Sequence, residues 1–140
     1  MISMTFKAAD AKNLFFDRAK VVNALHKKTL RGLSKAGAFV RTRSRHSIRK
    51  RKGISAAGGP PHSHVGLLRD KIFFFLDPSR EVVVVGPVRL NKPGEAPRLL
   101  EKGGMFRRNG RTMRYAARPF MKPALDAEAP KFPSFWAETS

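Results

Sequence analysis

Residues 53–66 divide the chain into two parts with different secondary-structure preferences. This segment reads Gly-Ile-Ser-Ala-Ala-Gly-Gly-Pro-Pro-His-Ser-His-Val-Gly, and two glycines followed by two prolines disfavour both helix and strand. We therefore predict a flexible loop, longer than most connections in a compact domain, and such length is typical of a functional or mobile segment. A helical pattern precedes this loop and β-type runs follow it, so we expect an α+β fold.

The segment before the loop, residues 17–52, predicts one long basic helix. Apolar and small side chains recur there at three- and four-residue spacings, and most basic side chains lie off that stripe. The stripe consists of Val22, Leu25, Leu30, Leu33, Ala36, Val40 and Ser44. Gly32 and Gly37 each cost about 1 kcal/mol against Ala in a helix interior. They indicate a bend or break near Gly37, or a close contact between the helix and a sheet.

The segment after the loop, residues 67–118, predicts a small antiparallel sheet with loops. Residues 71–76 and 81–86 are β-branched and aromatic runs joined by turn residues, which is typical of a hairpin. The runs lack alternation, so we expect both faces to be covered, one by the long helix and the other by a neighbouring subunit or the C-terminal segment. Residues 96–102 suit a short helix or strand, and residues 103–112 a basic loop.

We expect the whole chain, 1–140, to form one domain. Residues 1–16 are predicted to be an N-terminal arm. Pro119 opens a predicted short C-terminal helix over residues 119–129, and residues 130–140 form a tail. Trp136 in that tail either docks on a partner subunit or packs on its own domain.

Positive charge dominates the composition. The chain has 29 Lys and Arg against 10 Asp and Glu, a formal net charge of +19. No acidic residue occurs from Arg18 to Arg69, where 14 basic residues lie, or from Lys102 to Lys122, where seven lie. This imbalance favours contact with a polyanion, although the same residues could form a solvated basic surface.

The basic residues that we expect to face DNA form two clusters. They are Arg41, Arg43, Arg45, Arg49, Lys50, Arg51 and Lys52 near the end of the helix, and Arg107, Arg108 and Arg111 in the basic loop. No helix-turn-helix, zinc-finger or RNA-binding aromatic motif accompanies them. Contact with phosphates, independent of base sequence, is therefore the expected mode.

The sequence carries no pattern that indicates a reaction. The ten acidic residues are scattered, whereas two-metal and acid–base chemistry need them clustered. His62 and His64 have no acidic or Cys neighbour to complete a metal site, and Ser63 lacks a nucleophile-elbow pattern. We expect no enzymatic activity, no cofactor and no metal. Without an apolar run of 18 residues, we also expect no membrane span.

Three short motifs resemble those of a known protein family. Residues 60–70, Pro-Pro-His-Ser-His-Val-Gly-Leu-Leu-Arg-Asp, look like a "Pro-Pro-x-Ser-His-x-Gly-x-Leu-Arg" junction between a helix and the first strand. Residues 99–104, Leu-Leu-Glu-Lys-Gly-Gly, are similar to a "Glu-x-Gly" turn, although the family usually has an aromatic residue before the Gly. Residues 117–125 read Ala-Arg-Pro-Phe-Met-Lys-Pro-Ala-Leu. In this order the motifs resemble the neck proteins of tailed bacteriophages, of the tail-completion or head–tail joining type.

The resemblance implies a long helix packed on an antiparallel sheet with a short C-terminal helix. It also implies a structural virion protein that forms a homo-oligomeric ring, commonly a hexamer, between the connector or stopper and the tail tube or tail terminator, and that is assembled in the host cytoplasm. Candidate assembly residues are Glu101, Arg118, Pro119, Phe120, Phe135 and Trp136. Packaged double-stranded DNA is a further candidate partner. The alternative is a sequence-independent nucleic-acid-binding protein, which would need the charge but not the three motifs.

Overall fold

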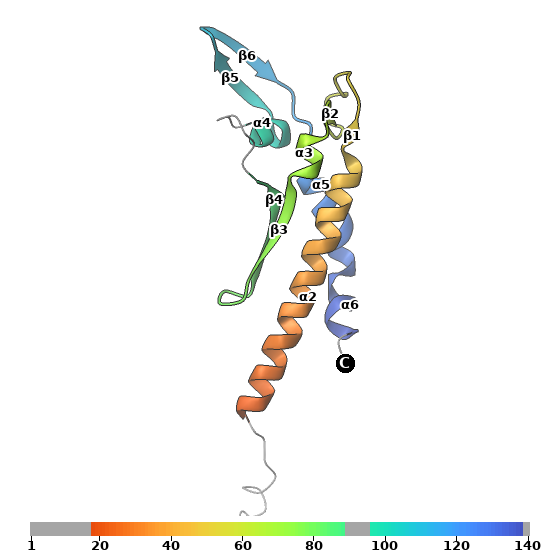
Figure 1. Cartoon of the computed structure of the whole chain (residues 1–140), viewed down its shortest axis with the longest axis vertical. Helices are drawn as coiled ribbons and strands as arrows, with labels where there is room; N and C mark the ends of the chain where they lie inside the picture. The colour runs from red at the N-terminus through yellow and green to blue at the C-terminus, as the bar shows by residue number, and fades with distance from the viewer. Residues whose placement is uncertain (1–17, 89–95, 139–140) are drawn as a thin grey trace, which may run out of the picture.

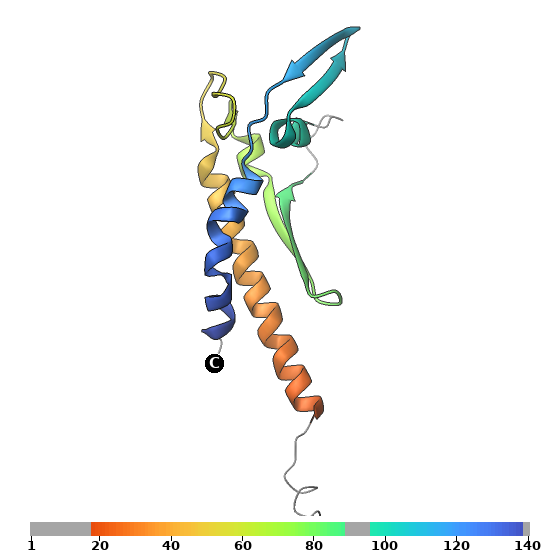
Figure 2. The same ribbon diagram turned by 180° about the vertical axis from the view of Figure 1, so that it is seen from behind.

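A single long helix forms the spine of the molecule. The computed structural model describes residues 18–88 and 96–138, so the predicted arm at 1–16 lies outside the described residues. The helix, α2 (Arg18–Ser47), has 30 residues. The C-terminal helices run along one flank of α2 and a β-hairpin lies along another (Figures 1 and 2). This long helix packed on small antiparallel sheets, with a short C-terminal helix, confirms the predicted α+β class.

The two glycines within α2 mark close contacts, and the helix does not break at Gly37. A Cβ atom at Gly37 would lie 2.6 Å from Val83 Cγ2 of the hairpin, and one at Gly32 would lie 2.6 Å from Trp136 Cε2. Glycine therefore lets a strand and an aromatic ring approach the helix axis more closely than Ala would allow. Of the predicted alternatives, the close contact with a sheet is confirmed at Gly37, and Gly32 makes a contact of the same kind with the C-terminal segment.

The hairpin that follows the central loop was predicted to within one residue. Strand β3 (Ile72–Asp77) pairs antiparallel with β4 (Val82–Pro87), and Phe74 lies opposite Val85. Its inner face packs on α2 as expected. Its outer face, however, is exposed in this chain, where Phe73, Phe75, Val82 and Val84 meet solvent.

The helix ends earlier than predicted, at Ser47 instead of residue 52. Arg49–Lys50 leaves the helix as a short strand, β1, and pairs in parallel with β2 (His62–Ser63). The turn carries the Ile48 side chain into the core, where it is almost fully buried with Leu68, Ile72 and Phe120. Burying Ile48 favours this exit over a further turn of helix, which would have placed Arg49 one turn from both Arg45 and Lys52, all of like charge.

Residues 103–112, predicted to be a basic loop, instead form a second hairpin. Strand β5 (Gly104–Arg108) pairs antiparallel with β6 (Arg111–Tyr115), and only Asn109 and Gly110 join them. Both turn residues have positive φ, 50° and 75°. Asn-Gly is the preferred pair for such a two-residue turn, so the signal was present in the sequence. The hairpin follows α4 (Ala96–Lys102), which settles the choice between helix and strand there.

The C-terminal segment is helical for longer than predicted. Helix α5 (Met121–Glu128) starts two residues after Pro119 and holds Pro123 in its first turn, and the 3-10 turn η1 (Ala129–Lys131) leads into α6 (Phe132–Ala137). The predicted tail is thus a short amphipathic helix. Its Phe135 ring is buried and stacks on Phe39 of α2, with ring centroids 5.0 Å apart.

Candidate nucleic-acid interface

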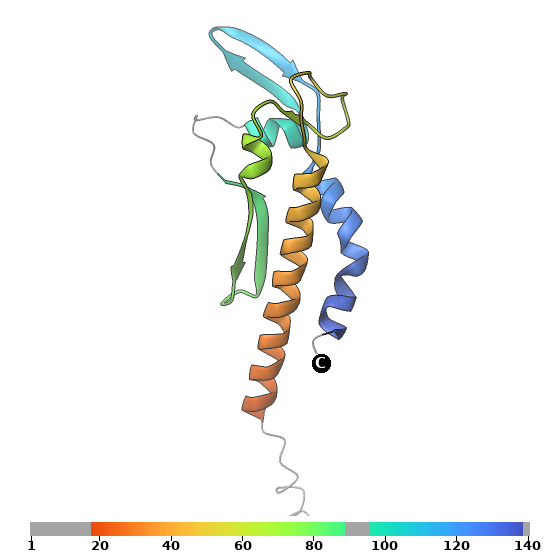
Figure 3. The same ribbon diagram turned by 45° about the vertical axis from the view of Figure 1, so that its right-hand side comes forward.

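Seven of the ten basic residues predicted to face DNA lie at one end of the molecule. One group sits on and just after β1, and the other surrounds the turn of the β5–β6 hairpin, and both elements lie at the end away from the start of α2 (Figures 1 and 3). All seven are exposed. They are Arg49, Lys50, Arg51, Lys52, Arg107, Arg108 and Arg111, and we refer to them as the basic end.

Two local features place these side chains. The β1–β2 pairing aligns Arg49 with His62 and fixes the backbone of the first group. The tight Asn109–Gly110 turn puts Arg108 directly opposite Arg111, so two guanidinium groups share one face of the hairpin tip. A shallow hollow beside β1, lined in part by His46, Arg49, Ser55 and His62, adds further hydrogen-bonding groups to this end.

The electrostatics of the basic end favour phosphate. No acidic residue lies in either stretch of sequence that contributes to it, so neighbouring charges along each stretch reinforce one another. Arg guanidinium groups match phosphate oxygens in a bidentate geometry. The arrangement can hold a polyanion without reading its sequence.

The remaining three predicted residues, Arg41, Arg43 and Arg45, interact with the fold itself. Arg41 Nε donates a hydrogen bond of 2.9 Å to the Ile72 carbonyl, and its guanidinium lies 5.4 Å from the centre of the Phe73 ring. Arg45 lies 3.6 Å from an Asp70 carboxylate oxygen. Each arginine therefore ties α2 to an element packed beside it, which makes all three poor candidates for contact with DNA.

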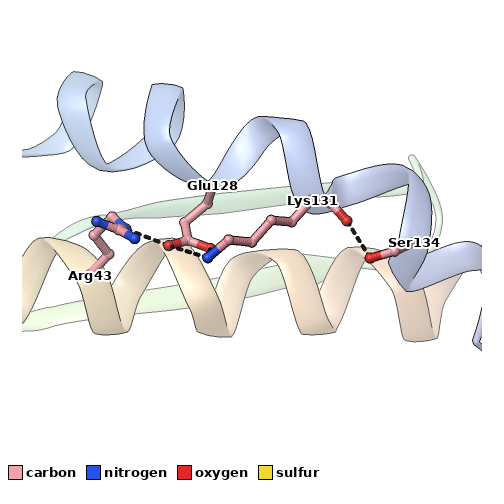
Figure 4. Close-up of polar contacts among 4 residues, drawn as sticks. All are labelled: Arg43, Glu128, Lys131 and Ser134. Atoms are coloured by element: carbon pink, nitrogen blue, oxygen red, sulfur yellow. Dashed lines mark hydrogen bonds and ion pairs between the residues drawn. The ribbon is translucent and has the colours of Figure 1, made fainter.

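Arg43 binds the one carboxylate that is buried among the described residues (Figure 4). Glu128 of α5 accepts a hydrogen bond from Arg43 Nε, and Lys131 Nζ lies 3.1 Å from its second oxygen. The Arg43 hydrogen bond is the main cause that lowers the pKa of Glu128, against the effect of burial. The backbone of Lys131 is hydrogen-bonded as well, because the Ser134 hydroxyl donates to the Lys131 carbonyl at 2.7 Å.

Two of the three resemblance motifs meet through Glu101. Its carboxylate accepts hydrogen bonds from three successive backbone N–H groups at the start of α5, those of Phe120, Met121 and Lys122, at 2.9, 3.0 and 2.7 Å. The first N–H groups of a helix have no partner within it, and Phe120 at the N-cap position supplies no side-chain acceptor. Glu101 therefore caps α5 from α4, 19 residues away in sequence.

The central loop, just before the 60–70 motif, is tied to the same place by Arg118 and its neighbours. Arg118 Nε donates to the Ser55 carbonyl at 3.0 Å, and the Ala117 carbonyl accepts from Gly58 N at 2.8 Å. Arg118 N also donates to the Leu100 carbonyl at 2.6 Å. Gly103 has a φ of 69°, and a Cβ there would lie 2.9 Å from Ala117 N, so only glycine fits. We call this meeting point of residues 55–58, 99–103 and 117–122 the motif junction.

Two of the six predicted assembly residues, Phe120 and Phe135, are buried in this chain, and Glu101, Arg118, Pro119 and Trp136 are half-buried. Phe120 is 1% exposed in the core, and Phe135 is buried between α2 and α6. Trp136 packs over Gly32, so of the two predicted alternatives the structure places it on its own domain. Phe120 and Phe135 therefore stabilise this chain's own fold and offer no surface to a neighbouring subunit.

The predicted site residues do not converge on a metal or catalytic group. His62 Nδ1 lies 2.9 Å from the Gly53 carbonyl, and His64 is exposed. Across residues 18–88 and 96–138, no three His, Asp or Glu side chains lie close enough together to hold a metal ion. Over the same residues, none of the helices has the length and apolarity needed to cross a membrane.

Comparison with known proteins identifies no relative: no family model, no curated protein sequence and no solved structure matches this chain.

Proposed function

We propose that this protein is a structural component of a tailed-phage particle, without enzymatic activity, which forms a homo-oligomeric ring at the head–tail junction. In this role it completes the tail or joins it to the head, between the connector or stopper and the tail tube or terminator. Assembly takes place in the bacterial cytoplasm, and the finished ring resides in the virion neck.

The motif junction is the observation that carries this proposal. The pieces that resemble the neck family are far apart in the chain, yet residues 99–104 and 117–125 are hydrogen-bonded to each other. Leu68 of the remaining piece, 60–70, packs in the same core cluster as Phe120 and Leu100. The pieces define one structural unit, which is what a shared scaffold requires and what an unrelated basic protein would not need.

The basic end supports a position on the DNA path. A ring of about six chains, each with a net charge of +19, would place on the order of a hundred positive charges around its lumen. The elements that carry the seven exposed residues, β1 with the loop after it and the β5–β6 turn, lie at the same end of an elongated chain (Figure 3), so a ring would present both groups on one side. Such a surface would contact DNA phosphates in any sequence.

The proposal is tested by quantitative mass spectrometry of purified particles, with heads and tails separated. We expect roughly six to twelve copies per particle, the range for one or two closed rings, in the neck or tail fraction. Complete absence from particles would reject the structural role. Dispersal over the capsid shell at hundreds of copies would reject the neck position.

A sequence-independent nucleic-acid-binding protein is the second candidate, and the acid-free basic end favours it. The affinity of the isolated chain for duplex DNA should then fall steeply as the salt concentration rises. In a plot of log affinity against log salt, the slope becomes about 0.9 less steep for each phosphate contact that is lost. Replacing Arg107, Arg108 and Arg111 by Gln should reduce that slope by about 2.7. A control variant with Lys27, Lys28 and Arg31 replaced by Gln should retain the wild-type slope. These residues lie in the first half of α2, away from the end of the molecule that carries the β5–β6 turn (Figure 1).

Weak binding by the isolated chain, together with incorporation into particles, supports the neck role. Tight binding by the isolated chain and absence from particles supports the second candidate. The two measurements therefore separate the two functions.

A further inference from the structure

Within residues 18–88 and 96–138, two apolar surfaces are left uncovered by the described elements, and they differ in shape. The first is the outer face of the β3–β4 hairpin, formed by alternate residues of both strands: Phe73, Phe75, Val82 and Val84. Phe75 is 69% exposed and pairs across the strands with Val84, which is 61% exposed. An isolated two-stranded hairpin is marginally stable in water, so covering this face would stabilise it. We call it the outer hairpin face.

The second surface is a shallow groove on the first half of α2. Val21, Ala24 and Leu25 form its floor, and Lys27, Lys28 and Arg31 line its side. Leu25 is 59% exposed, and Val22 beside it is also exposed. The start of α2 extends past the ends of both the hairpin and α6 (Figures 1 and 2). Farther along the helix, His26 contacts Glu81 of the hairpin turn and Gly32 contacts Trp136 of α6. We call it the helix groove.

The two surfaces carry opposite charges. The charged residues that line the helix groove are all basic. The turn at the end of the outer hairpin face holds two carboxylates, Asp77 and Glu81, with Arg80 between them in the turn. Asp77 is kept ionised by the Ser79 hydroxyl, which donates to it at 2.6 Å and lowers its pKa. Glu81 lies 2.6 Å from His26 Nδ1 and is 46% exposed.

A chain with a net charge of +19 strongly constrains how two copies can meet. Two helix grooves would bring basic residues together, and like charges placed side by side cost several kcal/mol. Pairing the helix groove with the acid-bearing hairpin joins apolar to apolar and basic to acidic. These surfaces are different parts of one chain, so each copy keeps one of each free for the next neighbour.

From this complementarity we propose that the helix groove of one copy receives the outer hairpin face of a second copy. Such a head-to-tail contact is heterologous, and it generates a closed ring when its rotation closes. The inference rests on the proposed function, because a ring at the neck requires each copy to bind the next one head to tail. It goes further by naming the two surfaces, and it assigns the interface to residues outside the motif junction.

The absence of Cys from the chain allows a direct test by disulfide cross-linking. Leu25→Cys and Phe75→Cys each replace an exposed side chain, so both variants should fold. Purified full-length variants are mixed, one of them carrying a size tag, and oxidised. We expect a disulfide heterodimer of the tagged and untagged chains, formed several-fold faster than in a mixture of Phe75→Cys with Ala57→Cys, which places the thiol on the exposed central loop.

Three outcomes would overturn the proposal. One is efficient cross-linking of Phe75→Cys with itself and no gain on mixing, which would show a symmetric hairpin–hairpin contact. The second is efficient cross-linking of Leu25→Cys with itself alone. The third is a mixture that cross-links no faster than the Ala57→Cys control at the highest soluble concentration.

A charge-and-size change provides an independent readout of the same contact. Leu25→Glu and Phe75→Lys should each lower the apparent mass in analytical ultracentrifugation, because each removes an apolar contact and places a like charge against the partner surface. Mixing the two variants should restore dimers, since the intact groove of one meets the intact hairpin of the other. Failure to restore them, when both variants show wild-type circular dichroism, would overturn the proposal. Absence of the chain from particles would reject the neck role and leave this solution contact standing.

Discussion

Removing the Glu101 carboxylate should uncouple α4 from α5. In Glu101→Ala the three N–H groups of Phe120, Met121 and Lys122 lose their acceptor. At a net value of about 1 kcal/mol per hydrogen bond, the destabilisation amounts to about 3 kcal/mol. This is a large fraction of the roughly 5–15 kcal/mol typical of a folded domain. Glu101→Gln keeps one carbonyl oxygen, so we expect about half that effect.

Urea unfolding followed by circular dichroism measures the effect. The midpoint should fall while the m-value stays constant, because the surface exposed on unfolding is unchanged. Glu138→Ala is the matched control: it removes a carboxylate that forms an exposed ion pair with Lys35, and such pairs contribute about 1 kcal/mol or less. Equal destabilisation by Glu101→Ala and Glu138→Ala would refute the capping role of Glu101.

Three further predictions concern the packing around α2 and the core. Phe120→Ala should destabilise the protein by about 3–5 kcal/mol in urea unfolding, since the ring is 1% exposed; a change below about 1 kcal/mol would place the ring outside the core. Gly32→Ala should cost about 1–3 kcal/mol through overpacking and change the fluorescence of Trp136, the single Trp; a more stable variant with unchanged emission would contradict the close contact. The pKa of Glu128 is lowered mainly by Arg43, so its stabilising contribution is complete above the ordinary Glu value of about 4.3 and is lost as the pH falls through the lower folded value. Urea midpoints of Arg43→Gln should therefore depend less on pH than those of the wild type between about pH 3 and 6, and an equal dependence would show that Arg43 does not hold the carboxylate ionised.

The local sequence pattern predicted the long helix and the first hairpin, because residues close together along the chain determine both elements. The stripe from Val22 to Ser44 predicted the long helix, because a single apolar face suffices to define it. The runs at 71–76 and 81–86 predicted the first hairpin for a similar reason, since β-branched and aromatic residues flank clear turn chemistry. The second hairpin was missed although Asn109–Gly110 marks it, because its strands are basic and lack a buried face.

The sequence could not show which of the basic residues near the end of α2 are used by the fold and which are exposed. Arg41, Arg43 and Arg45 look equivalent to Arg49, Lys50 and Arg51 in sequence. Their partners Ile72, Glu128 and Asp70 lie 25 to 85 residues away, and no local pattern reveals such pairs. By contrast, the helix at Phe132–Ala137 could have been predicted from the sequence, because Phe132, Phe135 and Trp136 have the three- and four-residue spacing of one helical face.

Composition and local patterns along the chain were enough to predict the class of the fold, the excess of positive charge and the absence of thiol chemistry, because each depends on residue types and near neighbours. The end of the long helix, the set of arginines exposed to solvent and the partners of Glu101 could be learned only from the folded molecule. Those outcomes depend on contacts between distant segments: the burial of Ile48 draws the chain out of the helix, and three backbone N–H groups at the start of α5 require an acceptor that its own N-cap does not provide.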